Sequence, residues 1–430
     1  MLDERAKVIG RINRETGRLG LQYTSLLGRQ FNLSGSKIEA SNEVYIDVNN
    51  PHMIVVCGKR GYGKSYTLGV LVEGLANLSE EIRRNLAVVI VDSMGIFWSL
   101  QVPNNGQETA LKEWGLQSKG FNVSVYYPEG LKEKYAKYPQ YFHEGFILYP
   151  SELNLEDWIY IFDMDETQAQ TGLLAKILAS AYEEYGNFYS LKDLIKLTNN
   201  SDEKENIKNA LLRKLISAQS WGIFSDKGKR IEEVVQPGKI IVLDFSGAGE
   251  LPWNVRTSLT AILIRKIYSK RAFARSEEEI ERLKKGKMSL KGVPLTWLVL
   301  DEAHLFVPAE RDTVATDPLL TWVRQGRYPG LSLLLATQQP GALDPRILSQ
   351  CDILVIHRVT AGNDSAAIEK RISEIYGSQS MGFYMKALPK EPGYAIVMDD
   401  KTEEIIPVSI RPRQSWHAGE SAKLEEYVGS

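Results

Sequence analysis

The chain has few of the residues that build covalent or metal-held scaffolds. Two of its 430 residues are cysteines, Cys57 and Cys351, which excludes a disulfide framework and a C-x-x-C metal site. Its five histidines are scattered and show no spacing typical of metal ligands. The fold must therefore depend on a hydrophobic core, for which a 43 % share of hydrophobic residues is ample.

Long apolar runs and an excess of one charge are also missing. No stretch of 18 or more apolar residues occurs, and the N-terminus, MLDERAKVIG, is charged rather than signal-like. We therefore expect no membrane segment and a cytoplasmic, reducing location. Lysine and arginine (52) nearly balance aspartate and glutamate (54), which excludes an overall polycation. DNA is still a compatible partner, because a ring that surrounds it needs positive charge only around its bore.

One glycine-rich stretch carries the strongest chemical signal. Residues 58–65 read GKRGYGKS, which is the phosphate-binding pattern G-x-x-x-x-G-K-S. The apolar run Met53–Cys57 before it predicts a buried strand, and residues 66–72 continue as a helix. Glycines let the backbone wrap around a phosphate, and the loop N–H groups and the helix N-terminus point at the anion. The residues expected to bind nucleotide are Gly58, Arg60, Gly61, Gly63, Lys64, Ser65 and Tyr66.

Two side chains of this loop have specific predicted roles. Lys64 would reach the β- and γ-phosphates, and the Ser65 hydroxyl would hold magnesium. The predicted cofactors are therefore ATP and Mg2+. The alternative is a glycine-rich turn without function, which the combined lysine, hydroxyl and preceding strand disfavour.

A second apolar run ends in two acids. Residues 295–302 read LTWLVLDE, which predicts a buried strand followed by Asp301 and Glu302. Asp301 would bind magnesium through its water shell, and Glu302 would orient and deprotonate the attacking water. A strand end followed by a helix N-cap would look similar, but the preceding phosphate loop favours the catalytic interpretation.

The next predicted strand, 331–336, is followed by Gln338. In a parallel sheet this strand end lies beside the γ-phosphate, so the amide could sense it; a simple turn is the alternative. Arg324 and Arg327 lie between the two strands, in the sequence RQGR. An arginine supplied to a neighbouring subunit would stabilise charge in the transition state. A surface helix end is the other interpretation.

Other charged residues leave two interpretations open. Asp92 ends the apolar run 86–92, where it could fix water or phosphate-proximal backbone, or cap the following turn. The basic stretches Arg213–Lys214, Lys227–Arg230 and Lys284–Lys291 are candidate DNA contacts. A run of charge is more often a solvated face.

The order of apolar runs predicts the architecture. Continuous rather than alternating strands indicate a mostly parallel sheet covered by helices on both faces, which is an α/β fold. A helix is expected over 255–275, with 276–291 as a solvated helix end and loop. The expected organisation is a short β-rich segment (1–50), a first part of the core (51–150), an all-α insertion (151–230), a second part of the core (231–415) and a C-terminal tail (416–430).

Several motifs in this order resemble HerA-type ATPases of the HerA/FtsK superfamily. They are GKRGYGKSYT, VVQPGKIIVLDFSG, LTWLVLDEAHLFVP, VRQGRYPGLSLLLATQQP and LDPRILSQCDILVIHRVT. DEAH followed by GR-Y-G and ATQ-x-P differs from the linking motifs of kinases, small GTPases and the ABC family. The resemblance covers roughly residues 50–415 and implies a RecA-like P-loop NTPase core. It also implies a hexameric ring that moves double-stranded DNA through its pore using ATP, often with a nuclease partner.

The resemblance also implies residue roles. Lys64 and Ser65 would bind phosphate and magnesium, Asp301 and Glu302 would be the metal and water residues, and Gln338 would be the polar sensor. Arg327 matches the family's trans-acting arginine better than Arg324 does. The segment RPRQSWHAGE resembles a tail that reaches toward a neighbour.

One feature departs from the family. Typical members carry a full N-terminal β-barrel, whereas about 50 residues precede the phosphate loop here. A role in conjugative transfer, packaging or antiviral defence therefore stands beside nuclease-coupled repair. The predicted function is an ATP-driven DNA translocase or helicase. The alternatives are an assembly or secretion ATPase that does not touch DNA, and a nucleotide-binding subunit that controls a bound effector enzyme.

Overall fold

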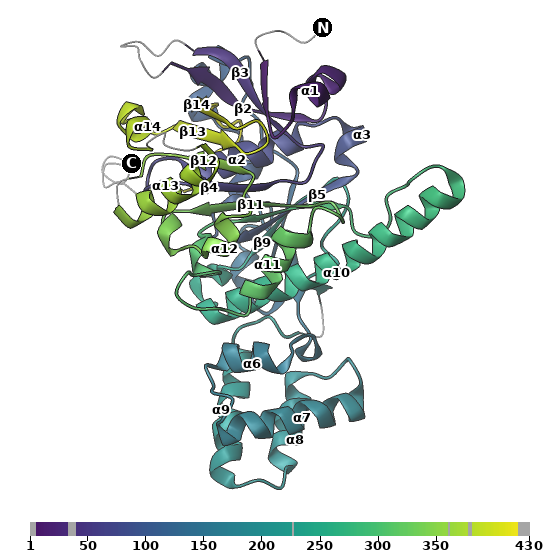
Figure 1. The fold of residues 1–430 in the computed structure, drawn as a ribbon. Helices are drawn as coiled ribbons and strands as arrows, with labels where there is room; N and C mark the ends of the chain where they lie inside the picture. Colours follow the sequence, from purple (N-terminus) through teal and green to yellow (C-terminus); the bar gives the residue numbers. More distant parts are fainter. Residues whose placement is uncertain (1–5, 33–39, 226–227, 360–361, 377–380, 420–430) are drawn as a thin grey trace.

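The strands of the chain join into one sheet. The computed structural model describes residues 6–32, 40–225, 228–359, 362–376 and 381–419 (Figure 1). The strands in these residues are β1 (Ala6–Ile9), β2 (Thr24–Phe31), β3 (Ala40–Asp47), β4 (Met53–Cys57), β5 (Leu86–Asp92), β6 (Val123–Pro128), β7 (Glu144–Ile147), β8 (Lys229–Arg230), β9 (Ile240–Asp244), β10 (Leu295–Leu300), β11 (Leu331–Thr337), β12 (Ile353–Ile356), β13 (Tyr394–Asp399) and β14 (Glu404–Ile410). Their order across the sheet is β1-β3-β2-β14-β13-β12-β4-β11-β10-β5-β9-β6-β7-β8.

The central part of the sheet is parallel and buried on both faces. Every pairing from β12 across to β8 is parallel, whereas β13, β14 and β2 pair antiparallel. In β4, Met53, Val55 and Cys57 enter one hydrophobic core, and Ile54 and Val56 enter the other. Because both faces are apolar, the strand reads as a continuous hydrophobic run. The predicted α/β class is confirmed.

Some helices of the described residues pack against the two faces of this sheet, and others form a lobe below it (Figure 1). The helices are α1 (Asn13–Leu19), α2 (Lys64–Ala76), α3 (Glu80–Arg83), α4 (Glu108–Glu113), α5 (Lys132–Tyr135), α6 (Leu155–Phe162), α7 (Ala169–Tyr185), α8 (Leu191–Asn200), α9 (Glu205–Gln219), α10 (Trp253–Lys285), α11 (Thr316–Gln325), α12 (Pro345–Leu348), α13 (Gly362–Tyr376) and α14 (Met381–Ala387). Helix α2 packs in the core that contains Ile54, whereas α10 and α11 pack in the core that contains Val55. No helix in the described part of the chain has both the length and the apolar character needed to cross a membrane.

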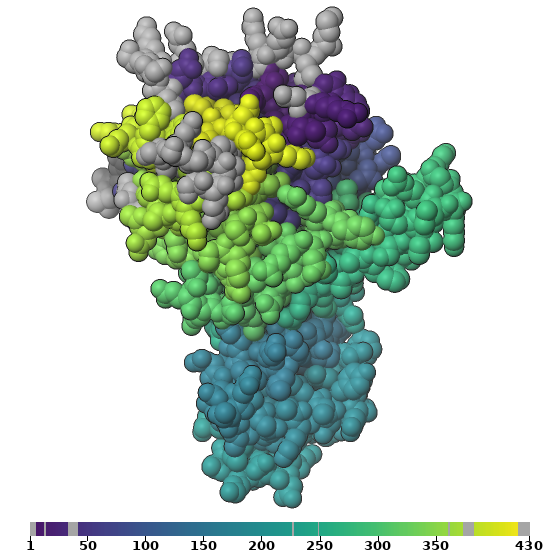
Figure 2. Space-filling model, in the orientation of Figure 1, coloured from purple at the N-terminus to yellow at the C-terminus, as the bar shows by residue number. Residues whose placement is uncertain are grey.

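The helical insertion forms a separate lobe. Helices α6 to α9 lie below the sheet, where Figure 1 and Figure 2 show them in teal. The lobe is anchored by Arg265 of α10, whose Nη2 donates to Asp157 Oδ2 at 2.7 Å. The expectation that all of 151–230 is helical is wrong at its end, because Lys229–Arg230 form β8 and pair with β7. The edge of β7 offers unpaired backbone groups that a short strand can satisfy.

Helix α10 is longer than the sequence predicts. It continues through the charged residues 276–285, which were expected to form a helix end and loop, and it projects beyond the sheet (Figure 1). Arg271 explains the extension, because its Nη1 and Nη2 donate to both carboxylate oxygens of buried Glu278 at 2.9 and 2.6 Å. The helix ends at Gly286, which has a φ of 65°.

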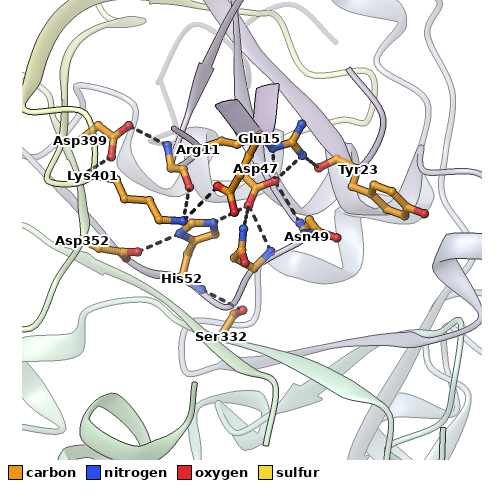
Figure 3. Close-up of polar contacts among 12 residues, drawn as sticks. Arg11, Glu15, Tyr23, Asp47, Asn49, His52, Ser332, Asp352, Asp399 and Lys401 are labelled. Atoms are coloured by element: carbon orange, nitrogen blue, oxygen red, sulfur yellow. Dashed lines mark hydrogen bonds and ion pairs between the residues drawn. The ribbon is translucent and has the colours of Figure 1, made fainter. Parts of the chain in front are cut away.

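A buried charge network attaches the N-terminal segment to the sheet. Strands β1 to β3 join the other strands through the pairing of β2 with β14. Arg11 Nε donates to Asp47 Oδ1 at 2.9 Å, and Asp47 Oδ2 lies 3.2 Å from His52 Nε2 (Figure 3). The other ring nitrogen of His52 lies 2.9 Å from Asp352 Oδ2. With a carboxylate at each nitrogen, both nitrogens donate, so His52 is an imidazolium ion.

This network predicts a pH-dependent stability. Burial alone would lower the pKa of His52, but hydrogen bonds to Asp352 and Asp47 outweigh it and raise the pKa to about 9 from 6.5. The folded state therefore keeps a proton that the unfolded chain releases, and this stabilisation is complete below pH 6.5 and lost as the pH rises through about 9. We expect the free energy of unfolding, measured with urea from pH 6 to 9.5, to fall more steeply in the native chain than in His52→Gln. If the free energy of unfolding changed with pH in the same way in both proteins, the assignment of His52 as an imidazolium ion would be contradicted.

Candidate nucleotide-binding and catalytic site

Parallel strands bring the predicted motif residues to one edge of the sheet. Strands β4, β11 and β10 are neighbours and run in the same direction, so their C-terminal ends meet. Gly58 follows β4, Asp301 follows β10, and Gln338 follows β11. This edge is where the ligands of open α/β sheets bind.

The glycines of the loop are required for two different reasons. Gly61 and Gly63 have φ values of 82° and 101°, which favour glycine. A Cβ on Gly61 would meet nothing within 4 Å, so the backbone conformation and not crowding favours glycine there. At Gly58 the reason is that the backbone passes close to His357, because a Cβ on Gly58 would lie 2.5 Å from the Cβ of His357. The loop is also held to the segment after β12, because Lys59 N–H donates to Arg358 O at 2.8 Å.

Replacing Gly58 by alanine should therefore damage the loop. The added methyl group would press against buried His357, and we expect a loss of about 1–3 kcal/mol in the free energy of unfolding together with weaker ATP binding. Gly172→Ala is the matched control, because that glycine lies in α7 and a Cβ there would meet nothing within 4 Å. Thermal unfolding and ATP titration would measure both effects. Equal behaviour of the two variants would contradict the prediction.

A hydroxyl and a buried carboxylate meet beneath the loop. Ser65 Oγ donates to Asp301 Oδ2 at 2.6 Å. Burial raises the pKa of Asp301, whereas the hydrogen bond from Ser65 acts in the opposite direction. Mg2+ is usually bound by one or two protein oxygen ligands together with substrate phosphates and water. The pair fits that donor set, and the described residues contain no group of three or more His, Cys, Asp or Glu that could hold a metal alone.

Glu302 lies beside this pair in a strained conformation. Its φ of 52° and ψ of 46° are unusual for a residue with a side chain. Its Oε1 accepts a hydrogen bond from Gln338 Nε2. Its Oε2 is buried and has no hydrogen-bond partner in the described residues. Burial raises the pKa of Glu302, and the charge of Asp301 raises it further. Such a carboxylate can take a proton from a water molecule.

The loop lysine faces these acids. Lys64 is buried, and its Nζ donates to Lys59 O at 3.2 Å. Burial lowers its pKa, and the charges of Glu302 and Asp301 act against that change. Arg60, by contrast, is exposed, and Tyr66 is half-buried with its hydroxyl on Gln107 Oε1 at 2.8 Å.

Two histidines of this edge were not predicted. His357 Nε2 lies 2.9 Å from Thr67 Oγ1, and its Nδ1 lies 2.9 Å from Tyr394 O. Burial lowers the pKa of His357 to about 4, so the ring is neutral and braces the first turn of α2. His304 Nδ1 lies 3.0 Å from Thr337 Oγ1. The available signal was a polar residue at the end of an apolar strand, as in ILVIH.

Asp92 caps the turn that follows β5, which is one of the two roles that the sequence left open. Its carboxylate accepts the backbone N–H groups of Met94, Gly95 and Phe97 at 3.2, 2.7 and 2.7 Å. Burial and the neighbouring Asp244 raise its pKa to about 7. The side chain therefore shapes the turn after β5.

The basic stretches lie on different elements, in α9, in β8 and at the end of α10. Lys214 donates to Phe162 O in the lobe, Lys229 pairs with Glu144 at 2.6 Å, and Lys291 pairs with Glu281 at 3.0 Å. Lys227 lies outside the described residues. These contacts lie within the chain, and DNA binding by the basic stretches stays a prediction.

Arg327 lies at the opposite edge of the sheet. It follows α11 and precedes β11, and its Nη2 contacts Asp352 Oδ2, the same oxygen that faces His52 just before β4. From His52 to Gly58 the chain runs the length of one strand, which is about 20 Å at ~3.3 Å per residue. The side chain is 62 % exposed. Arg327 is therefore not in the site of its own chain, and neither is the exposed Arg324 at the end of α11.

The C-terminal segment binds its own chain. Glu73 of α2 is fully buried, and Arg411 Nη1 and Arg413 Nε donate to its two oxygens at 2.9 and 3.3 Å. The backbone N–H groups of Gln414 and Ser415 also donate to Glu73, both at 3.0 Å. We call these contacts the Glu73 clasp. The expected reach toward a neighbour is wrong for residues 411–415, because a buried carboxylate draws both arginines inward; residues 420–430 lie outside the described part.

Comparisons with known proteins bear on the family and the fold of the chain. The chain is 23 % identical over 339 residues to the DNA double-strand break repair helicase HerA of Saccharolobus solfataricus, covering 78 % of this chain and 60 % of the relative. The chain thus spans about 60 % of that relative's length. The structure of VirB4 of Thermoanaerobacter pseudethanolicus is similar with a TM-score of 0.58 at 15 % identity, covering 94 % of this chain and 98 % of the other.

A second solved structure has the same fold. The plasmid coupling protein TrwB in complex with ADP and Mg2+ gives a TM-score of 0.53 at 15 % identity, covering 86 % of this chain and 87 % of the other. The family profile described as "Helicase HerA, central domain" matches residues 33–268, which is more than half of the chain. The chain therefore belongs to the family of the HerA helicase central domain.

Proposed function

We propose that this chain hydrolyses ATP with Mg2+ at the C-terminal ends of the neighbouring strands β4, β10 and β11. The observation that carries the proposal is the 2.6 Å contact between Ser65 Oγ and Asp301 Oδ2, from two motifs 236 positions apart. A phosphate loop alone predicts binding. A phosphate loop whose hydroxyl meets a buried acid has the parts needed for hydrolysis when it lies beside a carboxylate oxygen that has no hydrogen-bond partner in the described residues.

Each side chain then has a role that its surroundings support. The loop N–H groups and Lys64 hold the phosphates, and Ser65 and Asp301 hold magnesium, which would neutralise charge on the β- and γ-oxygens. Glu302 orients the attacking water and takes its proton at the buried Oε2. Gln338 holds Glu302 through Oε1 and reports the state of the γ-phosphate. Arg327 supplies positive charge to the site of a neighbouring copy.

The work done with this ATP is the movement of double-stranded DNA. We infer a homo-oligomer, with six copies in a ring, that acts with a nuclease or another DNA-processing partner. Membership of the HerA helicase family and the likeness to a plasmid coupling protein support the inference. The exposed position of Arg327 supports a shared site, because its own phosphate loop is about 20 Å away.

The test is the steady-state ATPase rate with and without linear duplex DNA, with particle mass recorded in parallel. Strong stimulation by DNA in a six-subunit particle is expected. A flat response in an assembled ring would contradict DNA translocation. Heparin at equal charge concentration is the control for unspecific polyanion effects.

A second candidate is an ATPase that controls or assembles a partner effector, in conjugation, packaging or antiviral defence. The helical lobe favours it, because it projects from the core and carries Tyr182 and Phe188 with 59 % and 66 % exposure. Exposed aromatic side chains are typical of protein interfaces. An ATPase rate that responds to a co-purifying protein but not to DNA would select this candidate.

A further inference from the structure

Arg327 is attached to a carboxylate of its own chain. Its Nη2 donates to Asp352 Oδ2 at 3.4 Å, and Asp352 is its hydrogen-bond partner among the described residues. The arginine side chain is 62 % exposed, whereas that of Asp352 is 12 % exposed. An exposed arginine samples many rotamers, so a carboxylate at a fixed place restricts where the guanidinium lies.

Asp352 is fixed by buried groups and not by the arginine. Its Oδ1 accepts the backbone N–H of Met53 at 2.7 Å, and its Oδ2 faces His52 Nδ1 at 2.9 Å (Figure 3). His52 is held from its other side by Asp47, which Arg11 binds in turn. The carboxylate of Asp352 therefore has one orientation before Arg327 reaches it.

The N-terminal segment completes this support. Gly10 passes so close to the imidazole that a Cβ there would lie 2.6 Å from His52 Cε1. The backbone N–H of Gly10 donates to Asp399 Oδ2 at 2.8 Å, which fixes the segment to the end of β13. The support of Asp352 thus includes residues just after β1, around the start of β4 and at the end of β13.

We propose that Asp352 is a positioning residue for Arg327. It holds the guanidinium toward the face where a neighbouring copy presents its triphosphate. A guanidinium has five N–H donors, so the bond from Nη2 to Asp352 leaves Nη1 and Nε free to bind phosphate oxygens. The inference rests on the proposed function, because it assumes that Arg327 acts on another subunit.

Mixed oligomers test this role. Subunits with Lys64→Ala keep Arg327 but lose their own site, whereas subunits with Arg327→Ala keep the site but lose the arginine. Mixing them should restore ATP hydrolysis at the mixed interfaces. Adding Asp352→Asn to the Lys64→Ala subunits should reduce the recovered rate about three- to ten-fold, as expected for loss of one partly exposed ion pair. Asparagine keeps an oxygen for the N–H of Met53.

The same substitution in the other subunit is the decisive comparison. Asp352→Asn in the Arg327→Ala subunits should leave the recovered rate unchanged, because those subunits have no arginine to position. Asp400→Asn in the Lys64→Ala subunits is the matched control; Asp400 lies near Asp352 but pairs with Arg371. It should leave recovery unchanged.

Three other results of the mixing experiment would contradict the proposal in whole or in part. An equal loss in both arrangements would mean that Asp352 only stabilises the fold and would overturn the proposal. Full recovery with Asp352→Asn beside Arg327 would overturn the positioning role and leave the trans action of Arg327 standing. No recovery in the parent mixture would overturn both.

Discussion

Glu302→Gln should abolish most ATP turnover while ATP binding is kept. The amide preserves the size of the side chain and an oxygen for Gln338 Nε2, but it cannot accept the proton of the attacking water. Loss of a general base typically lowers kcat about 10²- to 10⁴-fold. Steady-state hydrolysis and ATP titration would separate the two properties.

The control for this variant is close in sequence. Glu310→Gln makes the same change of charge at an exposed position after the same strand, and it should leave kcat unaltered. If Glu302→Gln turned over within about three-fold of the native chain, the buried Oε2 would not be the site of proton transfer.

Glu73→Gln should be among the most destabilising single changes in the chain. Glu73 is the buried anion that balances Arg411 and Arg413, and both arginines are buried. Removing one partner of a buried ion pair leaves charge without compensation, which costs about 3–5 kcal/mol. The clasp also reaches Tyr66, a residue of the proposed nucleotide site, because the backbone N–H of Arg413 donates to Tyr66 Oη at 2.6 Å. We therefore expect a lower free energy of unfolding and weaker ATP binding together.

Glu108→Gln is the matched control for the clasp. Glu108 pairs with Lys112 at 3.9 Å on the surface, with 56 % and 78 % of the two side chains exposed. Such pairs contribute about 0–1 kcal/mol, so urea unfolding should barely change. Similar unfolding curves for Glu73→Gln and Glu108→Gln would contradict the structural role of the clasp.

The parts of the fold that could be predicted are those with local signals. Strands β4 and β5 have the predicted bounds, because each is a continuous apolar run that ends at a loop or an acid. The convergence of Ser65, Asp301 and Gln338 followed from the rule that parallel strands end at one edge. Such rules need no knowledge of distant partners.

The rest depended on contacts between distant residues. Glu73 lies within an apolar helix. Nothing near it in the sequence predicts that it pairs with two arginines more than 330 positions later. The neutral state of His357 results from burial against Thr67 and Tyr394, which only the folded sheet creates. Helix α10 was predicted too short because Arg271 and Glu278 look like solvated charges until their bidentate pair is seen.

The length of α10 has a mechanical consequence. Its 33 residues give a rod of about 50 Å, at ~1.5 Å per residue, and roughly 20 Å of it extend past Arg271. A rigid rod turns rotation into displacement, so a tilt of about 10° at Arg271 moves the tip by roughly 3.5 Å over the ~20 Å beyond it. Small changes in the sheet against which α10 packs would thus appear as a larger displacement at Lys285.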